Sequence, residues 1–257
     1  MLRNYISNLC GVCVLGGLGK RLKPFTDNQP KAMLPVGIEN KPMLEFVIKP
    51  WVKLGLKNYV FCTGYKSKLI EGYLGNGKDF DIKIHYSREK NNLETGGAIK
   101  NAIENKFLKK NAPAVIFYCD DLARLNPFDL IKIHLTGKKQ GFKATLVTTN
   151  KFKTNYGIVE AKLLKNGLKK VTDFKEKPLI EKNANVGIYC FEPEVLELID
   201  KYRPPFKLES VILPKLVERD WLMMHEISWD DWIPVNTDKE YEQVMKINLT
   251  NFYSKFL

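Results

Sequence analysis

A glycine-rich segment that directly follows a short apolar run places the strongest constraint on this chain. The apolar run, residues 12–15, is typical of a buried strand, and Gly16, Gly17 and Gly19 follow it within four residues. Glycines at this density let the chain turn sharply and bring bare backbone close to a ligand. Backbone N–H groups that open toward a helix in such a turn form a concavity suited to phosphate oxygens. The segment therefore predicts a phosphate-binding loop.

Two cationic residues support this interpretation, because a glycine-rich turn on its own is often only a tight turn. Arg21 follows the loop, and its guanidinium group can donate a fork of hydrogen bonds to a polyphosphate. Lys31 adds a mobile point charge ten residues further on. The loop is not a P-loop, since Lys20 is followed by Arg21 rather than by Ser or Thr. It is not a dinucleotide-binding fingerprint either, since Leu22 stands where a third glycine is needed.

Strand-like and helical stretches alternate along the first 150 residues. The runs 58–62, 81–86, 114–119 and 142–149 predict strands, and the stretches near 43–54, 65–74, 96–107 and 127–137 predict helices. The run 114–119 is apolar throughout, as in a central strand of a parallel sheet. This alternation predicts a doubly wound, mostly parallel, Rossmann-like α/β sheet. Ligands of such folds bind at the carboxyl ends of the strands.

The pattern changes after residue 150. Strands are predicted at 156–161, 168–175, 185–191 and 223–227, and helices at 193–201, 210–219 and 238–255. Asn166-Gly167 is a hairpin-turn signal between the first two of these strands. We therefore expect one domain over residues 1–257, with halves 1–150 and 151–257 and a small antiparallel β extension in the second half.

Composition argues against several functional classes. Lys and Arg exceed Asp and Glu by 41 − 29 = 12, but the basic residues are spread along the chain and no aromatic-basic RNA motif occurs. We expect a solvated basic surface that attracts anionic substrates, and no nucleic-acid partner. No run of 18 apolar residues occurs, so no membrane association is expected. The five scattered cysteines are typical of reduced thiols, which favours a cytoplasmic location.

Polar residues follow or precede several of the predicted elements. Asp120 and Asp121 come directly after the apolar run 114–119, where a magnesium ion on a nucleoside triphosphate would need an oxygen ligand. They could equally begin a turn or cap the next helix. Thr95 can cap the helix expected at 96–107, and Gly96 permits flat stacking of a ring on the backbone. An ordinary helix cap would show the same pattern.

The loop and several other segments together resemble the sugar-1-phosphate nucleotidylyltransferases, also called nucleotide-sugar pyrophosphorylases. The segments that carry the resemblance are residues 15–26, 30–36, 93–99, 119–120, 156–159, 174–178 and 183–189, so it covers the whole chain. It implies transfer of a nucleotidyl group from an NTP to a sugar 1-phosphate, with release of pyrophosphate and a requirement for Mg²⁺. Residues 1–150 would then be the nucleotide-binding half, and residues 151–257 the sugar-phosphate-binding half.

The resemblance also implies roles for single residues. Leu15, Gly16, Gly17, Gly19, Glu89, Thr95 and Gly96 would bind the nucleotide; Gly157, Glu176 and Asn185 would bind the sugar; Arg21, Lys31 and Lys177 would be catalytic; and Asp120 would hold Mg²⁺. Asp121 is then expected to point away from the ion. Glu89 falls at the base-reading position, and an ionised carboxylate can accept two adjacent donors of guanine. This favours guanylyl transfer to a mannose- or heptose-type sugar 1-phosphate.

Two positions depart from the family pattern. Cys119 replaces the glycine that usually precedes the metal-binding Asp. Pro234 stands where the family commonly has a second metal-binding Asp, and Asp230, Asp231, Asn236 or water could fill that site. No hexapeptide repeats occur, so no left-handed β-helix is expected within the chain.

Two alternatives remain open. One is a non-catalytic homologue that binds a nucleotide sugar and acts as a sensor or regulatory subunit. The departure at Pro234 permits this alternative. The other is a nucleotidyltransferase for a non-sugar phosphate such as phosphocholine, or for a molybdenum cofactor. The expected partners are therefore an NTP and a sugar 1-phosphate, and a homo-oligomer is compatible with the sequence.

Overall fold

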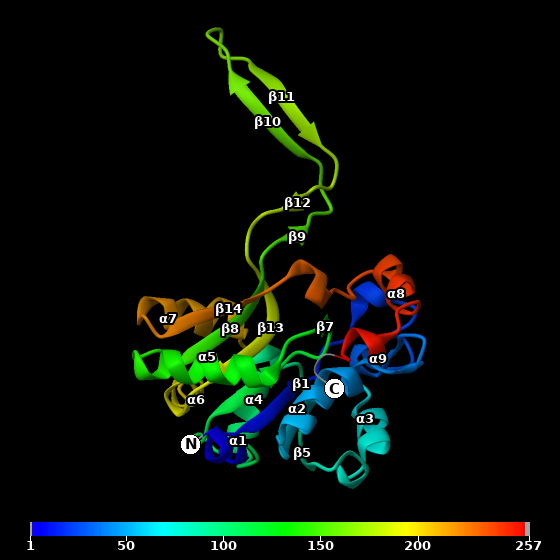
Figure 1. The fold of residues 1–257 in the computed structure, drawn as a ribbon, viewed down its shortest axis with the longest axis vertical. Coiled ribbons are helices and arrows are strands. Elements are labelled where there is room, and N and C mark those ends of the chain that lie inside the picture. The colour runs from blue at the N-terminus through cyan, green and yellow to red at the C-terminus, as the bar shows by residue number, and fades with distance from the viewer. Residues whose placement is uncertain (1, 255–257) are drawn as a thin grey trace.

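A computed structural model describes residues 2–254, and one seven-stranded sheet lies at its centre (Figure 1). The strands run in the order β14-β8-β13-β6-β1-β4-β5. Their bounds are β1 Cys10–Val14, β4 Asn58–Thr63, β5 Lys83–Arg88, β6 Ala114–Phe117, β8 Ala144–Thr149, β13 Ala184–Phe191 and β14 Leu222–Ile227. All neighbours are parallel except where β13 pairs with β6 and β8. The expected mostly parallel sheet is therefore confirmed.

Helices cover both faces of this sheet. On one face lie α2 (Met43–Leu54), α3 (Ser67–Leu74) and α5 (Pro127–Lys139), and on the other lie α4 (Glu94–Glu104), α6 (Pro193–Asp200) and α7 (Leu213–Glu218). A π-helical turn, Leu208–Ile212, precedes α7, and α1 (Leu2–Asn8), which was not expected, precedes β1. Among the described residues, no helix combines the length and the apolar character that a membrane crossing requires.

The central strands are buried on both faces, which explains their continuous apolar sequence. In β6, Val115 and Phe117 pack into the apolar cluster that includes α2, α3 and α5. Ala114 and Ile116 pack into the cluster that includes α4, α6 and α7. Successive side chains of a strand point to opposite faces, so a strand between two helical layers needs apolar residues at every position. This core rigidly positions the residues that follow β6.

A third apolar cluster fixes the C-terminal helices beside the segment that follows the glycine-rich loop. α8 (Asp238–Val244) and α9 (Leu249–Phe252) contribute Val244 and Leu249 to a cluster that includes Met43. The expectation of one helix over 238–255 is wrong. The first helix ends at Val244, and the side chain of Asn248 caps a new one. Residue 255 lies outside the described residues.

A narrow antiparallel ribbon, called the arm below (residues 152–180), extends away from the sheet (Figure 1). Its inner part pairs β9 (Phe152–Lys153) with β12 (Leu179–Ile180), and its outer part pairs β10 (Ile158–Leu163) with β11 (Lys169–Lys175). Gly167 turns the chain between β10 and β11 with φ of +81°, so the expected hairpin is confirmed. Two further short pairs join β2 (Pro35–Val36) to β3 (Lys41–Pro42) and β7 (Leu122–Ala123) to β15 (Trp232–Ile233).

Glu192 lies at the centre of a buried polar network just after β13. Its side chain is 1% exposed, accepts hydrogen bonds from the hydroxyl of Tyr5 (2.9 Å) and from Lys138 Nζ (2.6 Å), and lies 3.1 Å from His134 Nε2. Burial alone would raise the pKa of Glu192. The hydrogen bonds from His134, Lys138 and Tyr5 outweigh burial and lower the pKa from 4.5 to about 2.

We expect Glu192 to contribute stability that is lost in acid. Because its pKa is lowered on folding, the contribution is complete above the unfolded pKa of 4.5 and disappears as the pH falls toward about 2. Glu192→Gln should lower the free energy of unfolding at pH 7 by roughly 2–3 kcal/mol and flatten its dependence on pH below 4.5. Denaturant unfolding across this pH range measures both effects.

Glu194→Gln is the matched control, since this partly exposed carboxylate forms an ion pair with Lys143 and with no other described residue. It should cost less than 1 kcal/mol. If the free energy of unfolding of Glu192→Gln falls below pH 4.5 as steeply as that of the parent, Glu192 does not have the proposed stabilising role.

Candidate active site

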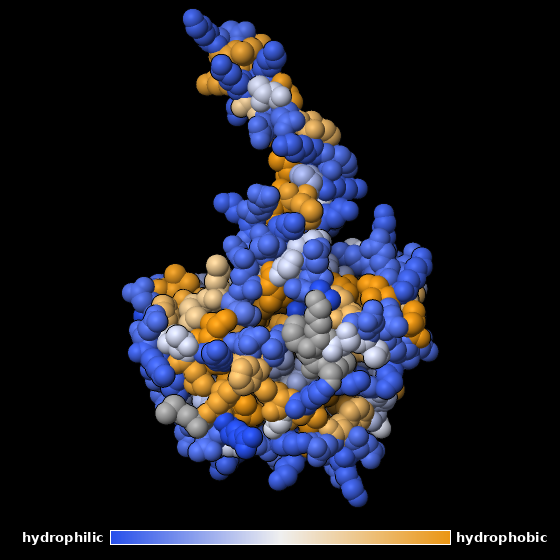
Figure 2. Space-filling model, in the orientation of Figure 1, coloured by the Kyte–Doolittle hydropathy of each residue, from blue (hydrophilic) through white to orange (hydrophobic). Residues whose placement is uncertain are grey.

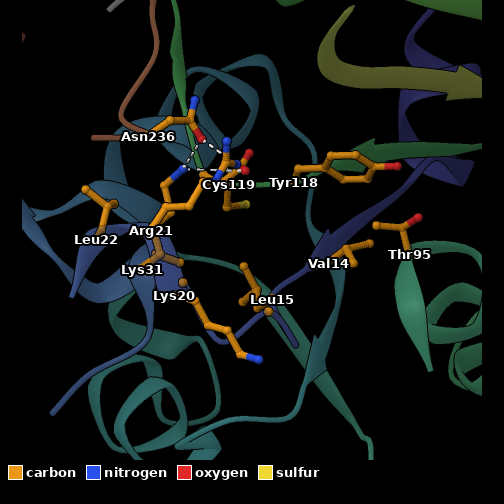
Figure 3. Close-up of a pocket in the computed structure, with 14 residues that line it drawn as sticks. Val14, Leu15, Lys20, Arg21, Leu22, Lys31, Thr95, Tyr118, Cys119 and Asn236 are labelled. Atoms are coloured by element: carbon orange, nitrogen blue, oxygen red, sulfur yellow. Dashed lines mark hydrogen bonds and ion pairs between the residues drawn. The ribbon is translucent and has the colours of Figure 1, made fainter. Parts of the chain in front are cut away.

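The glycine-rich loop lies at the carboxyl end of β1 and forms one wall of a cavity of about 300 Å³ (Figure 3). The expected nucleotide-binding, catalytic and metal-binding residues that line it are Leu15, Gly17, Gly19, Arg21, Lys31, Thr95 and Asp120. They come from the loop after β1, the start of α4 and the turn after β6. The carboxyl ends of neighbouring parallel strands meet at one edge of a sheet, so the fold brings these separate segments together.

The backbone conformation of the loop requires glycine at position 19, and Gly16 lies close against the carboxylate of Glu89. Gly19 has φ of +60°, a conformation that side chains disfavour, and its carbonyl accepts a hydrogen bond from Thr26 Oγ1 at 2.9 Å. A Cβ on Gly16 would lie 2.3 Å from Oε1 of Glu89. Gly17 has no atom within 4 Å of the place of a Cβ, and it lines the cavity. The loop therefore presents bare backbone to the cavity on a tightly fixed turn.

Arg21 and Lys31 gather around Asn236 at one end of the cavity, whereas Tyr118 and Thr95 lie at the other (Figure 3). Arg21 Nη2 donates to Asn236 Oδ1 at 3.0 Å, and Lys31 Nζ donates to the same oxygen at 3.3 Å. One neutral oxygen thus accepts from both cations. The remaining donors of Arg21 are available for an anion in the cavity, whereas Lys31 Nζ also lies 3.5 Å from Asp120 Oδ2 and 3.6 Å from Asp121 Oδ1.

The turn after β6 brings Asp120 to the cavity. Cys119 precedes it with φ of +52°, in the left-handed region that favours glycine. The family's glycine at this position is therefore replaced without loss of the turn, and the cysteine side chain is buried. Oδ2 of Asp120 lies 3.5 Å from Lys31 Nζ, and its side chain is 43% exposed. Part of the carboxylate consequently faces solvent and can bind a cation.

Asp121 belongs to the same charged cluster as Asp120 but does not line the cavity, and its orientation relative to a metal ion stays a prediction. Its Oδ1 lies 3.6 Å from Lys31 Nζ and accepts the backbone N–H of Val235 at 2.9 Å. Cys119, the left-handed residue before Asp120, turns the chain where both carboxylates lie near Lys31. Burial raises the pKa of Asp121 to about 7, Asp120 adds to the rise, and Lys31 opposes it.

Glu89 lies against the glycine-rich loop and is not among the residues that line the cavity. Its Oε1 lies beside Gly16, and its Oε2 accepts the backbone N–H of Leu93 at 2.9 Å. Burial raises the pKa of Glu89 above its ordinary value. Gly16 and Glu89 therefore support the loop from outside the cavity, and base reading by Glu89 stays a prediction.

Thr95 and Gly96 open α4 differently from what was expected. The helix begins at Glu94, so Thr95 lies inside its first turn and does not cap it. The hydroxyl of Thr95 instead donates to Glu209 Oε2 at 2.8 Å. A Cβ on Gly96 would lie 2.3 Å from the ring of Phe206, so this glycine permits close packing. Of the two residues, only Thr95 lines the cavity.

The residues expected to bind the sugar lie on β13 and in the arm, between its inner and outer strand pairs, outside this cavity. Gly157 and Glu176 are close across the ribbon, since a Cβ on Gly157 would lie 3.1 Å from Glu176 Oε2. Lys177 Nζ lies 3.7 Å from Glu176 Oε1, and Lys177 has φ of +46° directly before a proline, a strained conformation. Asn185 donates to the hydroxyl of Tyr189 at 2.6 Å.

Lys177 lines a second cavity, of about 410 Å³, between the inner part of the arm, the segment 229–237 and α8. Pro234 and Asp230 line this second cavity and not the first. Asp231 accepts a hydrogen bond from Arg124 Nε at 2.6 Å, so Arg124 engages its carboxylate. Of the substitutes considered for the second acidic residue, Asn236 is the one that lines the first cavity.

Asn236 and Asp121 are the two site residues to which the sequence analysis gave no definite role. A local signal for Asn236 exists, because Thr237 and Glu240 form a capping box that starts α8 directly after it. Glu240 Oε2 also accepts the backbone N–H of Asn236 at 2.8 Å. The hydrogen bonds of Asn236 to Arg21 and Lys31 span more than 200 residues, so no local pattern predicts them.

The cavity therefore combines backbone donors, two cations and exposed carboxylate oxygen at one sheet edge. This set suits a polyphosphate that arrives with a hard cation. Among residues 2–254, no group of three or more His, Cys, Asp or Glu side chains is placed to hold a metal ion. One or two carboxylates suit Mg²⁺, which keeps waters and phosphate oxygens as its other ligands.

Several known proteins have sequences similar to that of this chain. The family model described as nucleotidyl transferase matches residues 10–245. The chain is 29% identical over 235 residues to mannose-1-phosphate guanyltransferase of Yarrowia lipolytica, 30% over 251 residues to that of Pichia angusta, and 29% over 246 residues to UTP–glucose-1-phosphate uridylyltransferase of Synechocystis sp.. These alignments cover 90%, 95% and 90% of this chain and 61%, 65% and 61% of the relatives, so the chain spans less than two thirds of their length.

Two solved structures have the same fold. One, described as a glucose-1-phosphate thymidylyltransferase from Bacillus anthracis in complex with sucrose, matches with a TM-score of 0.70 at 20% identity and covers 92% of this chain and 93% of its own. The other, UDP-glucose pyrophosphorylase complexed with UDP-glucose, has a TM-score of 0.65 at 18% identity, with 97% and 99% covered. The family model spans most of the chain, including the glycine-rich loop and every residue that lines the cavity. The chain therefore belongs to the nucleotidyl transferase family.

Proposed function

We propose that this protein transfers a nucleotidyl group from an NTP to a sugar 1-phosphate and releases pyrophosphate. The observation that carries the proposal is the convergence of the glycine-rich loop, Arg21, Lys31 and Asp120 on one cavity. Relatives named mannose-1-phosphate guanyltransferase and UTP–glucose-1-phosphate uridylyltransferase support a sugar 1-phosphate as the acceptor. The regulatory and non-sugar alternatives have no such support.

The reaction requires positioning and charge neutralisation rather than a protein nucleophile. An oxygen of the sugar phosphate attacks the α-phosphorus in line, the bond to the β-phosphate oxygen breaks, and pyrophosphate leaves with its electron pair. Arg21 and Lys31 would neutralise the negative charge that develops on the leaving pyrophosphate. Asn236 holds both cations in advance, which lowers the reorganisation that the reaction requires.

The same residues fit Mg²⁺ as an ion that arrives with the triphosphate. The half-exposed carboxylate of Asp120 would hold it, and Asp121 and Asn236 supply further oxygen atoms nearby. Bound there, Mg²⁺ would neutralise charge on the phosphates. The buried position of Asp121 and its bond to a backbone N–H suit it to support of the cluster rather than to direct binding.

The acceptor would approach from the arm. Lys177 would hold the attacking phosphate, and Glu176 and Asn185 would bind sugar hydroxyls. The walls of the two cavities meet in the segment 234–237, since Pro234 and Thr237 line the second cavity and Asn236 lines the first. A sugar 1-phosphate between them would place its phosphate beside the triphosphate. The strained backbone of Lys177 supports a functional role for this residue.

For the nucleobase we propose guanine, with a mannose-type sugar 1-phosphate. Two of the relatives are named mannose-1-phosphate guanyltransferase. Among the described residues, Leu93 N–H bonds Oε2 of Glu89, and none donates to its Oε1. Uracil is the second candidate, because another relative is named UTP–glucose-1-phosphate uridylyltransferase.

Glu89→Gln is expected to lower the use of GTP more than that of any other NTP. Glutamine keeps the size and can still accept from Leu93, but its amide group places donors against the donors of guanine. The loss of one well-placed pair should reduce kcat/KM for GTP by about 10- to 100-fold. Initial rates with the four NTPs, each with mannose 1-phosphate, measure the change. An equal loss with all four would remove the base-reading role and leave Glu89 as a support of the loop.

A substrate panel tests the proposed function as a whole. Each of ATP, CTP, GTP, UTP and dTTP is combined with mannose, glucose and heptose 1-phosphates and with phosphocholine, and pyrophosphate is detected. Release with a sugar 1-phosphate, highest for GTP and mannose 1-phosphate, is the expected result. Release with phosphocholine alone, or with no combination, would overturn the proposal in favour of the non-sugar or the regulatory alternative.

A further inference from the structure

The far end of the arm, residues 161–172, carries a positive charge that no acidic side chain balances. This segment, called the tip below, contains no Asp or Glu and has four exposed lysines: Lys162, Lys165, Lys169 and Lys170. None of the four forms an ion pair with a described residue. Lysines nearer the body do have acidic partners, since Lys175 Nζ lies 3.1 Å from Asp173 Oδ2 and Lys177 Nζ lies 3.7 Å from Glu176 Oε1. The tip is therefore the part of the arm that attracts anions most strongly.

Cross-strand pairing concentrates this charge. Lys162 of β10 lies directly opposite Lys170 of β11, and Lys169 lies opposite Leu163. Like charges in directly opposite positions destabilise a strand pair, and a ribbon of two strands has little stability of its own to offset the repulsion. A negatively charged partner at the tip would relieve it. The pairing therefore favours an anionic partner for the tip.

Exposed leucines lie among these lysines. Leu163, Leu164 and Leu168 are 65%, 38% and 63% exposed. Of the eighteen large hydrophobic residues that are exposed in the described chain, nine belong to residues 156–179. Figure 2 shows hydrophobic residues between hydrophilic ones along the arm, well away from the body of the protein. A partner that matches the tip accepts apolar side chains as well as positive charge.

We propose that the tip binds the surface of a membrane that contains anionic lipids, with its lysines at the lipid phosphates and its leucines in the outer acyl region. Such a surface offers negative headgroups directly beside an apolar layer. A nucleic acid or another soluble polyanion offers the charge without the apolar layer. The turn between β10 and β11 lies at the end of the longest extension of the molecule, so it can reach a flat surface while the body stays clear of it (Figure 1).

A contact with the membrane surface does not require a spanning segment. The expectation of no membrane association rested on the lack of a long apolar run, which only a spanning segment needs. Each lysine near an anionic surface strengthens binding by about fivefold, so four lysines supply on the order of several hundredfold. Salt screens this attraction, and three leucines are too few for permanent anchoring. We therefore expect reversible, salt-dependent binding.

The test is sedimentation of the full chain with lipid vesicles, without substrate. Vesicles of phosphatidylcholine alone are compared with vesicles of phosphatidylcholine and phosphatidylglycerol in a two-to-one mixture, each at low and at high salt. We expect binding to the anionic vesicles only, weakened at least about tenfold at high salt. Equal binding to both kinds of vesicle, or binding to neither, would overturn the proposal.

A charge variant tests whether the tip makes this contact. Lys165→Gln with Lys169→Gln should weaken binding to the anionic vesicles by about 25-fold. The matched control, Lys132→Gln with Lys139→Gln, removes the same charge from exposed positions of α5, outside the arm. It should bind within about threefold of the parent, because salt screens charges far from the surface. A control that weakens binding as much as the tip variant would show that overall charge, and not the tip, attracts the membrane.

A leucine variant distinguishes a membrane from a soluble polyanion. Leu163→Ser with Leu168→Ser keeps every charge and should weaken binding to the anionic vesicles at least about tenfold. Binding equal to that of the parent would show that the leucines do not enter the membrane and would overturn the proposal. So would tighter binding of the parent to a single-stranded RNA oligonucleotide than to the anionic vesicles. Circular dichroism and thermal unfolding check the fold of each variant. No substrate is present, so the outcome is independent of the proposed catalytic function.

Discussion

Asp120→Asn is expected to abolish nucleotidyl transfer, the largest effect of any single substitution considered for this protein. The neutral amide would neither balance the charge of Lys31, 3.5 Å away, nor serve as a strong ligand for Mg²⁺. Loss of one preorganised charge in such a site typically costs two to three orders of magnitude in rate, and loss of metal binding adds to it. Pyrophosphate release at saturating substrates and high Mg²⁺ measures the effect.

Asp121→Asn is the neighbouring control for this substitution. Asparagine keeps the oxygen that accepts the N–H of Val235, so the fold of the turn should persist. We expect turnover within about tenfold of the parent, because the neutral amide oxygen of asparagine takes the place of the buried carboxylate oxygen as the acceptor. Retained turnover in Asp120→Asn would show that Asp120 does not have the proposed role, and equal losses in the two variants would show that the cluster acts as a unit.

Arg21→Ala should lower turnover by about two to three orders of magnitude. Its guanidinium group reaches the cavity and donates to Asn236, and within residues 2–254 no carboxylate forms an ion pair with it. Lys31 should not compensate, because it already lies between Asn236, Asp120 and Asp121. The measurement is kcat/KM for the NTP at a fixed, saturating sugar 1-phosphate concentration.

Lys23→Ala is the matched control for Arg21→Ala, since Lys23 is exposed and pairs with Asp27 outside the cavity. It removes one positive charge from the same segment. It therefore distinguishes the loss of the contact that Arg21 makes in the cavity from a general loss of electrostatic attraction for the anionic NTP. Turnover of Arg21→Ala within a few-fold of that of Lys23→Ala would contradict the role of Arg21.

Local patterns predicted the parts of this protein that depend on short stretches of chain. The apolar run before the glycines became β1, and the apolar run 114–119 contains β6, which ends two residues earlier, at Phe117. A strand between two helical layers needs apolar residues throughout. The loop that follows β1 and the carboxylates that follow β6 then meet at one sheet edge. That meeting follows from the parallel topology, which the alternation of strands and helices predicts.

Features that depend on distant contacts could not be predicted in the same way. β13 lies antiparallel between β6 and β8 in the central sheet, although its sequence reads only as a strand. Thr95 looks like a helix cap, but its contact with Glu209 holds it inside the first turn. Asn236 reaches Arg21 and Lys31 only because the third apolar cluster fixes α8 beside the loop.

The most direct test of the central claim is the stoichiometry of the reaction with labelled GTP. The purified protein is incubated with α-labelled GTP, Mg²⁺ and mannose 1-phosphate, and the labelled nucleotide sugar and pyrophosphate are quantified together. The account predicts one labelled nucleotide sugar for each pyrophosphate, and no pyrophosphate when the sugar 1-phosphate is left out. Pyrophosphate release without an acceptor, or label that stays entirely in GTP while other NTPs also fail, would contradict it.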